Sequence, residues 1–240
     1  MAILKEERIG GQRLILGDCR EVMPLLGQFD AVVTDPPYGI GESAGKAKTR
    51  TSGLTSKRNG ETRYVRDYGN KSWDATTADD EVEMARSIAR RHIIFGGNYY
   101  NLPPTSCWLV WDKLNGANDF ADCELAWTNI PKAVRRIPLL WNGCMRVERH
   151  IARVHPTQKP VALMEWCLGF LPDAVTILDP FMGSGTTLVA CQRMGRSGTG
   201  IELDPQYFDI ACKRVDEAAR QPDLLIAAPA PQPVQEGLPL

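Results

Sequence analysis

The residues best suited to chemistry stand together in TDPPYG, at positions 34–39. Two successive prolines cannot donate hydrogen bonds to a sheet, so the apolar strand that leads into Asp35 must end there. Pro36 and Pro37 also hold the Asp35 carboxylate and the Pro36 carbonyl in fixed relative directions. Two such acceptors can take both hydrogens of an amino group conjugated to a ring, which frees its lone pair for attack. Tyr38 adds an aromatic face for a nucleobase that has left its duplex.

A plain strand-end turn would contain the same residues, but a second segment favours chemistry. LDPFMGSGTT (178–187) leaves an apolar strand and opens a helix through Gly183 and Gly185. Glycine there lets a ligand approach the backbone, and the start of a helix offers free N–H groups. The segment lacks the lysine of a phosphate-binding loop and the third glycine of a dinucleotide fingerprint. Taken alone, these glycines are equally compatible with a structural tight turn.

Two acids next to this turn indicate which ligand it holds. Glu202 ends the following apolar segment, GIELD, where an acid is placed to accept both hydroxyls of a ribose. Asp179 ends the first strand and is placed to hold an ammonium group. An adenosine with an amino-acid tail satisfies both acids, which predicts S-adenosylmethionine as the cofactor. Direct in-line transfer of its methyl group would draw most of its rate from proximity and orientation.

Four segments in this order, TDPPYG, HPTQKP (155–160), DPFMGSGTT and GIELD, resemble the motif set of the β-class amino-group DNA methyltransferases. In that class the catalytic motif precedes the cofactor glycines, as it does here. The match spans residues 13–218 apart from two basic stretches. The resemblance implies an α/β fold, namely a circularly permuted Rossmann-like S-adenosylmethionine-dependent methyltransferase fold. Such a fold has a mostly parallel sheet with helices on both faces, as the alternating strands and helices after residue 160 also predict.

The resemblance implies a role for each matching residue. Asp35, Pro36, Pro37 and Tyr38 would be catalytic. Asp18, at the end of LILGD, would approach the adenine ring of the cofactor, and Lys159 with Pro160 would belong to the segment around its methionine end. The expected cofactor-binding residues are Asp18, Lys159, Pro160, Asp179, Phe181, Gly183, Gly185, Thr186 and Glu202. An Asp in the catalytic motif favours adenine-N6 over cytosine-N4 as the target.

The formal net charge of −1 hides two strongly basic stretches. Residues 41–72 and 128–154 each carry a net charge of +5, which suits binding to a polyanion, although two solvated loops are an alternative. We expect 41–72 to be a mobile loop that orders on double-stranded DNA. The resemblance implies that 128–154 is a target-recognition insertion. The candidate DNA-binding residues are Lys46, Lys48, Arg50, Arg58, Arg135, Arg136 and Arg146.

The composition, 43% hydrophobic and 24% charged over 240 residues, is typical of one compact domain. We expect residues 1–220 to form a single catalytic domain and the proline-rich segment 221–240 to be a disordered tail. No apolar run is long enough to cross a bilayer, and the N-terminus is too charged for a secretory signal. Seven dispersed cysteines and three histidines show no zinc-binding spacing. These features predict a cytoplasmic enzyme without a metal or a membrane partner.

Apolar runs and their punctuation predict the elements that position these motifs. We expect strands at 13–18, 29–37, 92–100, 106–113, 123–129, 174–181 and 196–204, and helices at 77–91, 160–171, 185–195 and 205–220. The tryptophans of the fourth and fifth strands are expected in the core.

Other functions are consistent with parts of this pattern. The nearest is methylation of cytosine-N4. RNA or protein-glutamine methyltransferases typically carry Asn in place of Asp35 and place their glycines before it. A non-catalytic nucleic-acid-binding module would not need Asp35, Tyr38 and Glu202 together. Cytosine-C5 chemistry uses a Pro-Cys pair, which is absent from the sequence. The family includes homodimers, so the chain is a candidate to form one.

Overall fold

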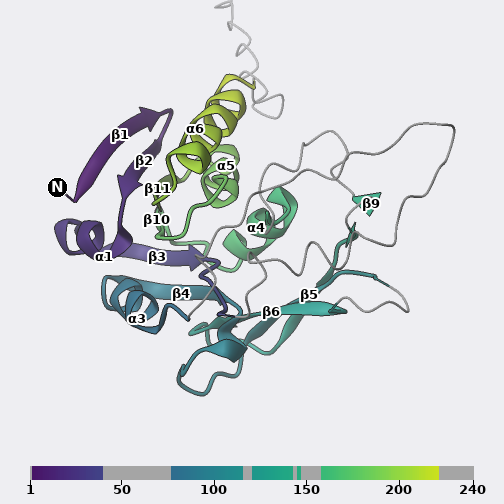
Figure 1. Cartoon of the computed structure of the whole chain (residues 1–240). Helices are drawn as coiled ribbons and strands as arrows, with labels where there is room; N and C mark the ends of the chain where they lie inside the picture. The colour runs from purple at the N-terminus through teal and green to yellow at the C-terminus, as the bar shows by residue number, and fades with distance from the viewer. Residues whose placement is uncertain (1, 40–76, 116–120, 143–144, 147–157, 222–240) are drawn as a thin grey trace, which may run out of the picture.

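The computed structural model describes residues 2–39, 77–115, 121–142, 145–146 and 158–221 (Figure 1). The strands are β1 (Ile3–Ile9), β2 (Gln12–Gly17), β3 (Phe29–Thr34), β4 (Ala89–Phe95), β5 (Trp108–Asp112), β6 (Cys123–Thr128), β7 (Arg135–Pro138), β8 (Trp141–Asn142), β9 (Met145–Arg146), β10 (Thr176–Asp179) and β11 (Ser197–Glu202). The helices are α1 (Cys19–Val22), α3 (Asp79–Ser87), α4 (Val161–Leu168), α5 (Thr186–Arg193) and α6 (Pro205–Arg220), with 3₁₀ turns η1 (Met23–Leu25) and η2 (Gly97–Tyr99).

One nine-stranded sheet organises the described residues, in the order β1-β2-β11-β10-β3-β4-β6-β5-β7. Adjacent strands are parallel to one another in the run β2-β11-β10-β3-β4. Strand β1 is antiparallel to β2, and β6 is antiparallel to both β4 and β5. The sheet is therefore parallel at its centre, with an antiparallel extension on the β6–β5 side, which lies at the lower right of Figure 1.

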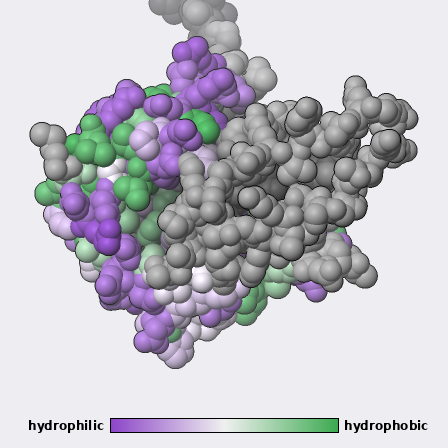
Figure 2. Space-filling model, in the orientation of Figure 1, coloured by the Kyte–Doolittle hydropathy of each residue, from purple (hydrophilic) through white to green (hydrophobic). Residues whose placement is uncertain are grey.

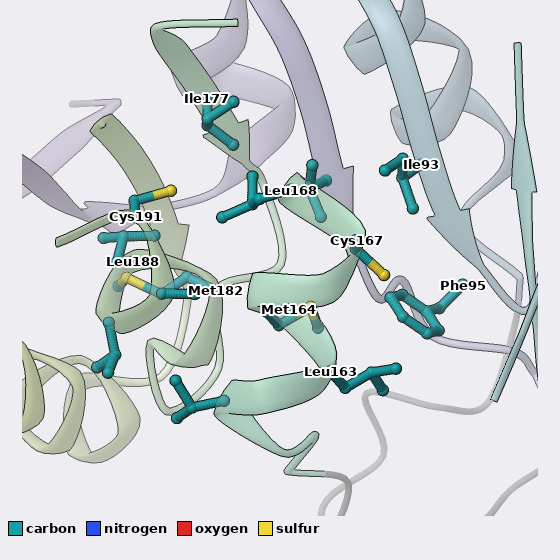
Figure 3. Packing of buried hydrophobic residues seen from close by; sticks show 14 of the residues in the cluster. Ile93, Phe95, Leu163, Met164, Cys167, Leu168, Ile177, Met182, Leu188 and Cys191 are labelled. Carbon is teal, nitrogen blue, oxygen red and sulfur yellow. The ribbon is translucent and has the colours of Figure 1, made fainter. Parts of the chain in front are cut away.

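Successive side chains of the central strands enter two different cores, as the period of a strand requires. Leu14 and Leu16 of β2 join a cluster built with α4, α5 and α6, while Ile15 between them joins a second cluster with α1 and α3. In Figure 3, Leu168 of α4 lies between Ile177 of β10 and Ile93 of β4. Both faces of the parallel sheet are thus covered by helices, which confirms the α/β fold class.

Helix α6 shows how local sequence fixes an element beside the site. The side chain of Asp204 caps it by accepting from the backbone N–H of Gln206 at 2.8 Å, and Pro205 occupies the first turn, where its missing N–H costs nothing. Phe208 and Val215 lie on its buried face. Hydrophilic residues cover its outer face (Figure 2).

The structure differs from the expected elements at several boundaries. Strand β1 was not predicted, because most of its side chains are exposed at the edge of the sheet and four of its seven residues are charged. The helix expected at 77–91 ends at Ser87, and Ala89 already begins β4, which ends at Phe95. Within 128–154, residues 135–138 form β7 and pair with β5 in the main sheet. The expected loop 41–72 and the tail from residue 222 lie outside the described residues.

Candidate active site

The two candidate motifs lie at the carboxyl ends of adjacent parallel strands. Strand β3 leads into Asp35, and β10 ends at Asp179. These strands pair directly, and the Thr34 hydroxyl donates to Asp179 Oδ1 at 2.8 Å. Crevices at the carboxyl ends of parallel strands are the usual ligand sites of open α/β sheets. Residues about 145 positions apart in the sequence are thereby brought into one site.

A cavity of about 830 Å³ opens at these strand ends, within the usual size of small-molecule sites. Of the predicted site residues, nine line it: Asp18, Asp35, Pro37, Lys159, Asp179, Phe181, Gly183, Thr186 and Glu202. Pro36, Tyr38, Pro160 and Gly185 are not among the lining residues. Tyr38 nevertheless contacts Asp35, and Pro160 immediately precedes α4 as its N-cap residue.

The glycine turn is shaped by Glu202 and by α6. Glu202 accepts from the backbone N–H of Gly183 through Oε2 and from that of Asp204 through Oε1, both at 2.8 Å. Gly185 has φ of +76°, and an added Cβ would lie 2.9 Å from the Cβ of Ala211 in α6. Glycine is therefore required at 185 by its backbone conformation and by close packing. Neighbouring Ser184 and Thr186 line the cavity instead.

We call the glycine turn together with its two acids, Asp179 and Glu202, the cofactor turn. Asp179 is buried and Glu202 is partly buried. Burial raises the pKa of Asp179 to about 6, although hydroxyls of Thr187 and Thr34 partly offset the effect. Burial likewise raises the pKa of Glu202 to about 7, against the two backbone donors. Neither acid forms an ion pair with a described lysine or arginine. A ligand bearing positive charge or hydroxyl donors would relieve this desolvation.

Asp18 lines the same cavity. Its Oδ1 accepts from the backbone N–H of Arg20 at 2.9 Å, which caps α1, and the Arg20 guanidinium lies 2.6 Å from Oδ2. Hydrogen bonding to Arg20 lowers the pKa of Asp18. Both oxygens are thus held in place at the cavity wall.

The catalytic motif holds its carboxylate between two donors. The Tyr38 hydroxyl donates to Asp35 Oδ1 and the Lys159 ammonium to Oδ2, each at 2.5 Å. The Tyr38 ring stacks on Tyr99, with centroids 5.0 Å apart and planes at 15°. The backbone of Gly96 packs so closely against the same ring that a Cβ there would overlap it. Asp35 therefore has a fixed orientation at the cavity wall.

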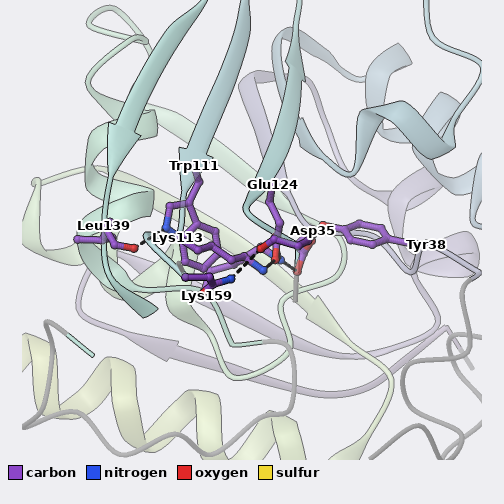
Figure 4. A network of polar contacts seen from close by, with 9 residues as sticks. Asp35, Tyr38, Trp111, Lys113, Glu124, Leu139 and Lys159 are labelled. Carbon is purple, nitrogen blue, oxygen red and sulfur yellow. Dashed lines mark hydrogen bonds and ion pairs between the residues drawn. The ribbon is translucent and has the colours of Figure 1, made fainter. Parts of the chain in front are cut away.

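Two residues that the sequence did not single out complete this group (Figure 4). Lys159 Nζ also lies 3.1 Å from Glu124 Oε2, and Lys113 Nζ lies 2.5 Å from Glu124 Oε1. We call Lys113, Glu124, Lys159 and Asp35 the charge chain. Burial and the charge of Glu124 raise the pKa of Asp35, and Lys159 opposes the rise. The available signal was an acid within the otherwise uncharged strand CELAWT.

The candidate DNA-binding residues are only partly described. Arg135 and Arg136 are exposed on β7, at the edge of the sheet, where Arg136 forms an ion pair with Asp112 at 3.3 Å. Arg146 contributes its backbone to β9, and Lys46, Lys48, Arg50 and Arg58 lie outside the described residues. In the part of the chain that the structure covers, no group of three potential metal ligands is found, and no helix is long and apolar enough to span a membrane.

Comparison with known proteins points to one class of enzyme. The N6/N4 family model described as DNA methylase matches residues 96–213, a range that holds the glycine turn and Glu202 but not TDPPYG. The Type II methyltransferase M.HpaI of Haemophilus parainfluenzae is 25% identical over 85% of this chain and 74% of its own length. The Type II methyltransferase M2.DpnII of Streptococcus pneumoniae is 42% identical over 32% of this chain and 30% of its own.

Solved structures share the fold. The M1.HpyAVI complex with S-adenosylmethionine has a TM-score of 0.53 at 22% identity, covering 85% of this chain and 99% of that one. PvuII DNA methyltransferase, which is cytosine-N4-specific, has a TM-score of 0.51 at 14% identity, covering 88% of this chain and 89% of that one.

Proposed function

Because this chain belongs to the amino-group DNA methyltransferases, we propose that it transfers a methyl group from S-adenosylmethionine to the N6 amino group of adenine in duplex DNA. The observation that carries the proposal is the shared cavity. The Asp35 carboxylate lines the same space as Asp179, Gly183 and Glu202. A base held at Asp35 and a cofactor held at the glycine turn would therefore face each other.

The cofactor residues fit S-adenosylmethionine in charge. When bound, this cofactor supplies an electrophilic methyl group on a positively charged sulfonium. Partly buried Glu202 is suited to accept the ribose hydroxyls, and buried Asp179 to accept the ammonium group of the methionine end. Because neither acid has a cationic partner among the described residues, both gain one when a positively charged ligand binds.

The catalytic residues act on the amino group of the base. Its lone pair is conjugated into the ring, so it attacks poorly until its hydrogens are held by acceptors outside the ring plane. Asp35 is such an acceptor, and its bonds from Tyr38 and Lys159 orient its two oxygens before a base arrives. This preorganisation lowers the barrier without a covalent intermediate on the base.

The base must leave the helix to reach Asp35. A duplex does not enter a cavity of about 830 Å³, so base flipping is part of the proposal. Exposed Arg135 and Arg136 are suited to contact phosphates, which give affinity that falls with salt but no sequence information. The names of the Type II relatives support site-specific methylation within restriction-modification.

Cytosine-N4 is the second candidate target. The fold shared with the cytosine-N4-specific PvuII enzyme favours it, whereas Asp35 in the catalytic motif favours adenine. Unmethylated bacterial DNA, made by polymerase amplification, is incubated with the protein and labelled S-adenosylmethionine, and its nucleosides are separated. We expect N6-methyladenine at one short sequence after mapping. N4-methylcytosine would overturn the choice of base, and an absence of label would overturn the proposal.

A further inference from the structure

The charge chain poses a problem for the proposed reaction. Asp35 must accept hydrogens from the target amino group, yet Tyr38 and Lys159 already donate to its two oxygens. The Lys159 side chain is only 6% exposed. An ammonium group so deeply buried is costly to leave without a counter-charge. Lys159 can therefore yield its position on Asp35 only if another acceptor lies within reach.

Glu124 is that acceptor. Its Oε2 lies 3.1 Å from Lys159 Nζ while the lysine remains on Asp35. The Glu124 side chain is 21% exposed, and Glu124 is not among the residues that line the described cavity, so it is not placed to bind the cofactor directly. Figure 4 shows Glu124 reaching Lys159 from a different strand than the one that leads to Asp35.

Lys113 fixes Glu124 from the far side. It directly follows β5, and its backbone N–H donates to Asp122 at 2.9 Å, which holds the β5–β6 pair together. Its ammonium group lies 2.5 Å from Glu124 Oε1 and 5.0 Å from the centre of the Trp111 ring. Lysine and carboxylate thus alternate along the chain, and the four formal charges cancel. If Lys159 moved from Asp35 toward Glu124, the four charges would still balance within this group.

We infer that Glu124 is a positioning residue that holds Lys159 when the target amino group takes its place on Asp35, and that Lys113 keeps Glu124 oriented for this. The inference rests on the proposed function, but it applies equally to adenine-N6 and cytosine-N4. This role would make the antiparallel extension part of the catalytic apparatus, although β5, β6 and β7 contribute no residue to the lining of the described cavity.

The test compares Glu124→Gln in two backgrounds. Single-turnover methyl transfer is measured on amplified unmethylated bacterial DNA with saturating labelled cofactor. In the wild type, Glu124→Gln should slow transfer by on the order of tenfold or more, because Lys159 then competes for Asp35. In a Lys159→Met background no ammonium has to be held, so the same change should have little further effect. Cofactor affinity should stay the same in the Glu124→Gln single variant.

A matched control separates this effect from general loss of an ion pair. Glu165→Gln removes a partly exposed pair with Arg193, 3.4 Å long, on α4 and α5. It should leave the transfer rate unchanged. Equal slowing by Glu124→Gln in both backgrounds, or a parallel loss of cofactor affinity, would overturn the inference. If the wild type transfers no methyl group to DNA, the proposed function itself fails, which is a distinct result.

A second variant provides a readout that a structural role would not move, and it serves if Glu124→Gln fails to fold. The groups facing Glu124 are Lys113, Lys159, Asp35 and Tyr38. Burial alone would raise the pKa of Glu124, but Lys159 and Lys113 hold it below its ordinary value. Lys113→Gln should therefore raise that pKa. As the pH is lowered, the rate of methyl transfer should then begin to fall at a higher pH than in the wild type. Superimposable pH profiles would contradict the role of Lys113.

Discussion

The cofactor turn and the charge chain surround their enclosed acids with different partners. Asp179 and Glu202 are surrounded by neutral donors, and burial raises their pKa values to about 6 and about 7. Asp35 and Glu124 are also largely enclosed, with side chains 17% and 21% exposed, but lysines lie between and beside them. In the first region the described residues give neither acid a cationic partner, so a ligand would have to supply one, whereas the four charges of the second region balance one another. A cavity wall can thus indicate the charge of its ligand through the counter-charges it omits.

The largest effect is expected from substitution of Asp35. Asp35→Ala should reduce methyl transfer by at least about a hundredfold, because the amino group loses its preorganised acceptor. Cofactor binding should be largely kept, since the acids of the cofactor turn are untouched. Rates are measured by transfer of labelled methyl groups to DNA, and cofactor affinity by calorimetric titration. Asp35→Asn, which keeps the size and removes the charge, serves as the matched variant. Near-normal turnover by Asp35→Ala would contradict the proposed mechanism.

Cofactor binding should depend on pH through the acids of the cofactor turn. Hydroxyl donors favour the ionised carboxylate, so binding lowers the pKa of Glu202 from about 7 and releases a proton. Affinity should therefore weaken as pH falls through 7, and weaken further near pH 6, where Asp179 becomes protonated. Titrations in buffers of different ionisation enthalpy measure the released protons.

The Glu202→Gln variant tests which acid causes each step, because the glutamine side chain does not titrate. The step near pH 7 should disappear while the step near pH 6 remains. A wild-type affinity that is constant from pH 5.5 to 8 would show that the two acids do not meet the cofactor as proposed.

The smallest effect is expected in the scaffold of the glycine turn. Gly185→Ala should destabilise the fold by about 2–4 kcal/mol, since it adds a Cβ at positive φ and presses on Ala211. Gly195 also has positive φ, +66°, but an added Cβ there meets nothing within 4 Å. Gly195→Ala should therefore cost only about 1 kcal/mol. Urea unfolding measures both, and equal losses would show that contact with α6 is unimportant.

The difference between the two regions also explains what the sequence could predict. The cofactor turn is local, since Asp179 ends one strand, Gly183 follows it and Glu202 ends the next strand, so spacing alone brings them together. The fold class followed from the same alternation of strand and helix. The charge chain joins residues 35, 113, 124 and 159, whose meeting depends on the antiparallel extension. No periodicity within one segment encodes such a meeting.

Strand β1 was missed for a related reason. Its sequence, ILKEERI, alternates poorly because much of it faces water, and its place is fixed by pairing with β2 rather than by burial. Lys159 was expected near the methionine end of the cofactor. It does line the cavity, but its ammonium group contacts Asp35, a contact that sequence order does not reveal.

The strand order has a consequence for how the protein is made. Strands β2 and β3 are synthesised before β10 and β11, yet β11 and β10 lie between them in the sheet and are the last two strands that the structure describes. During synthesis, β2 and β3 therefore cannot complete their pairing until residues 176–202 have emerged from the ribosome. Such long-range pairing is slow and leaves apolar edges exposed in the meantime. Folding of the sheet should accordingly be completed by insertion of β10 and β11 into its centre.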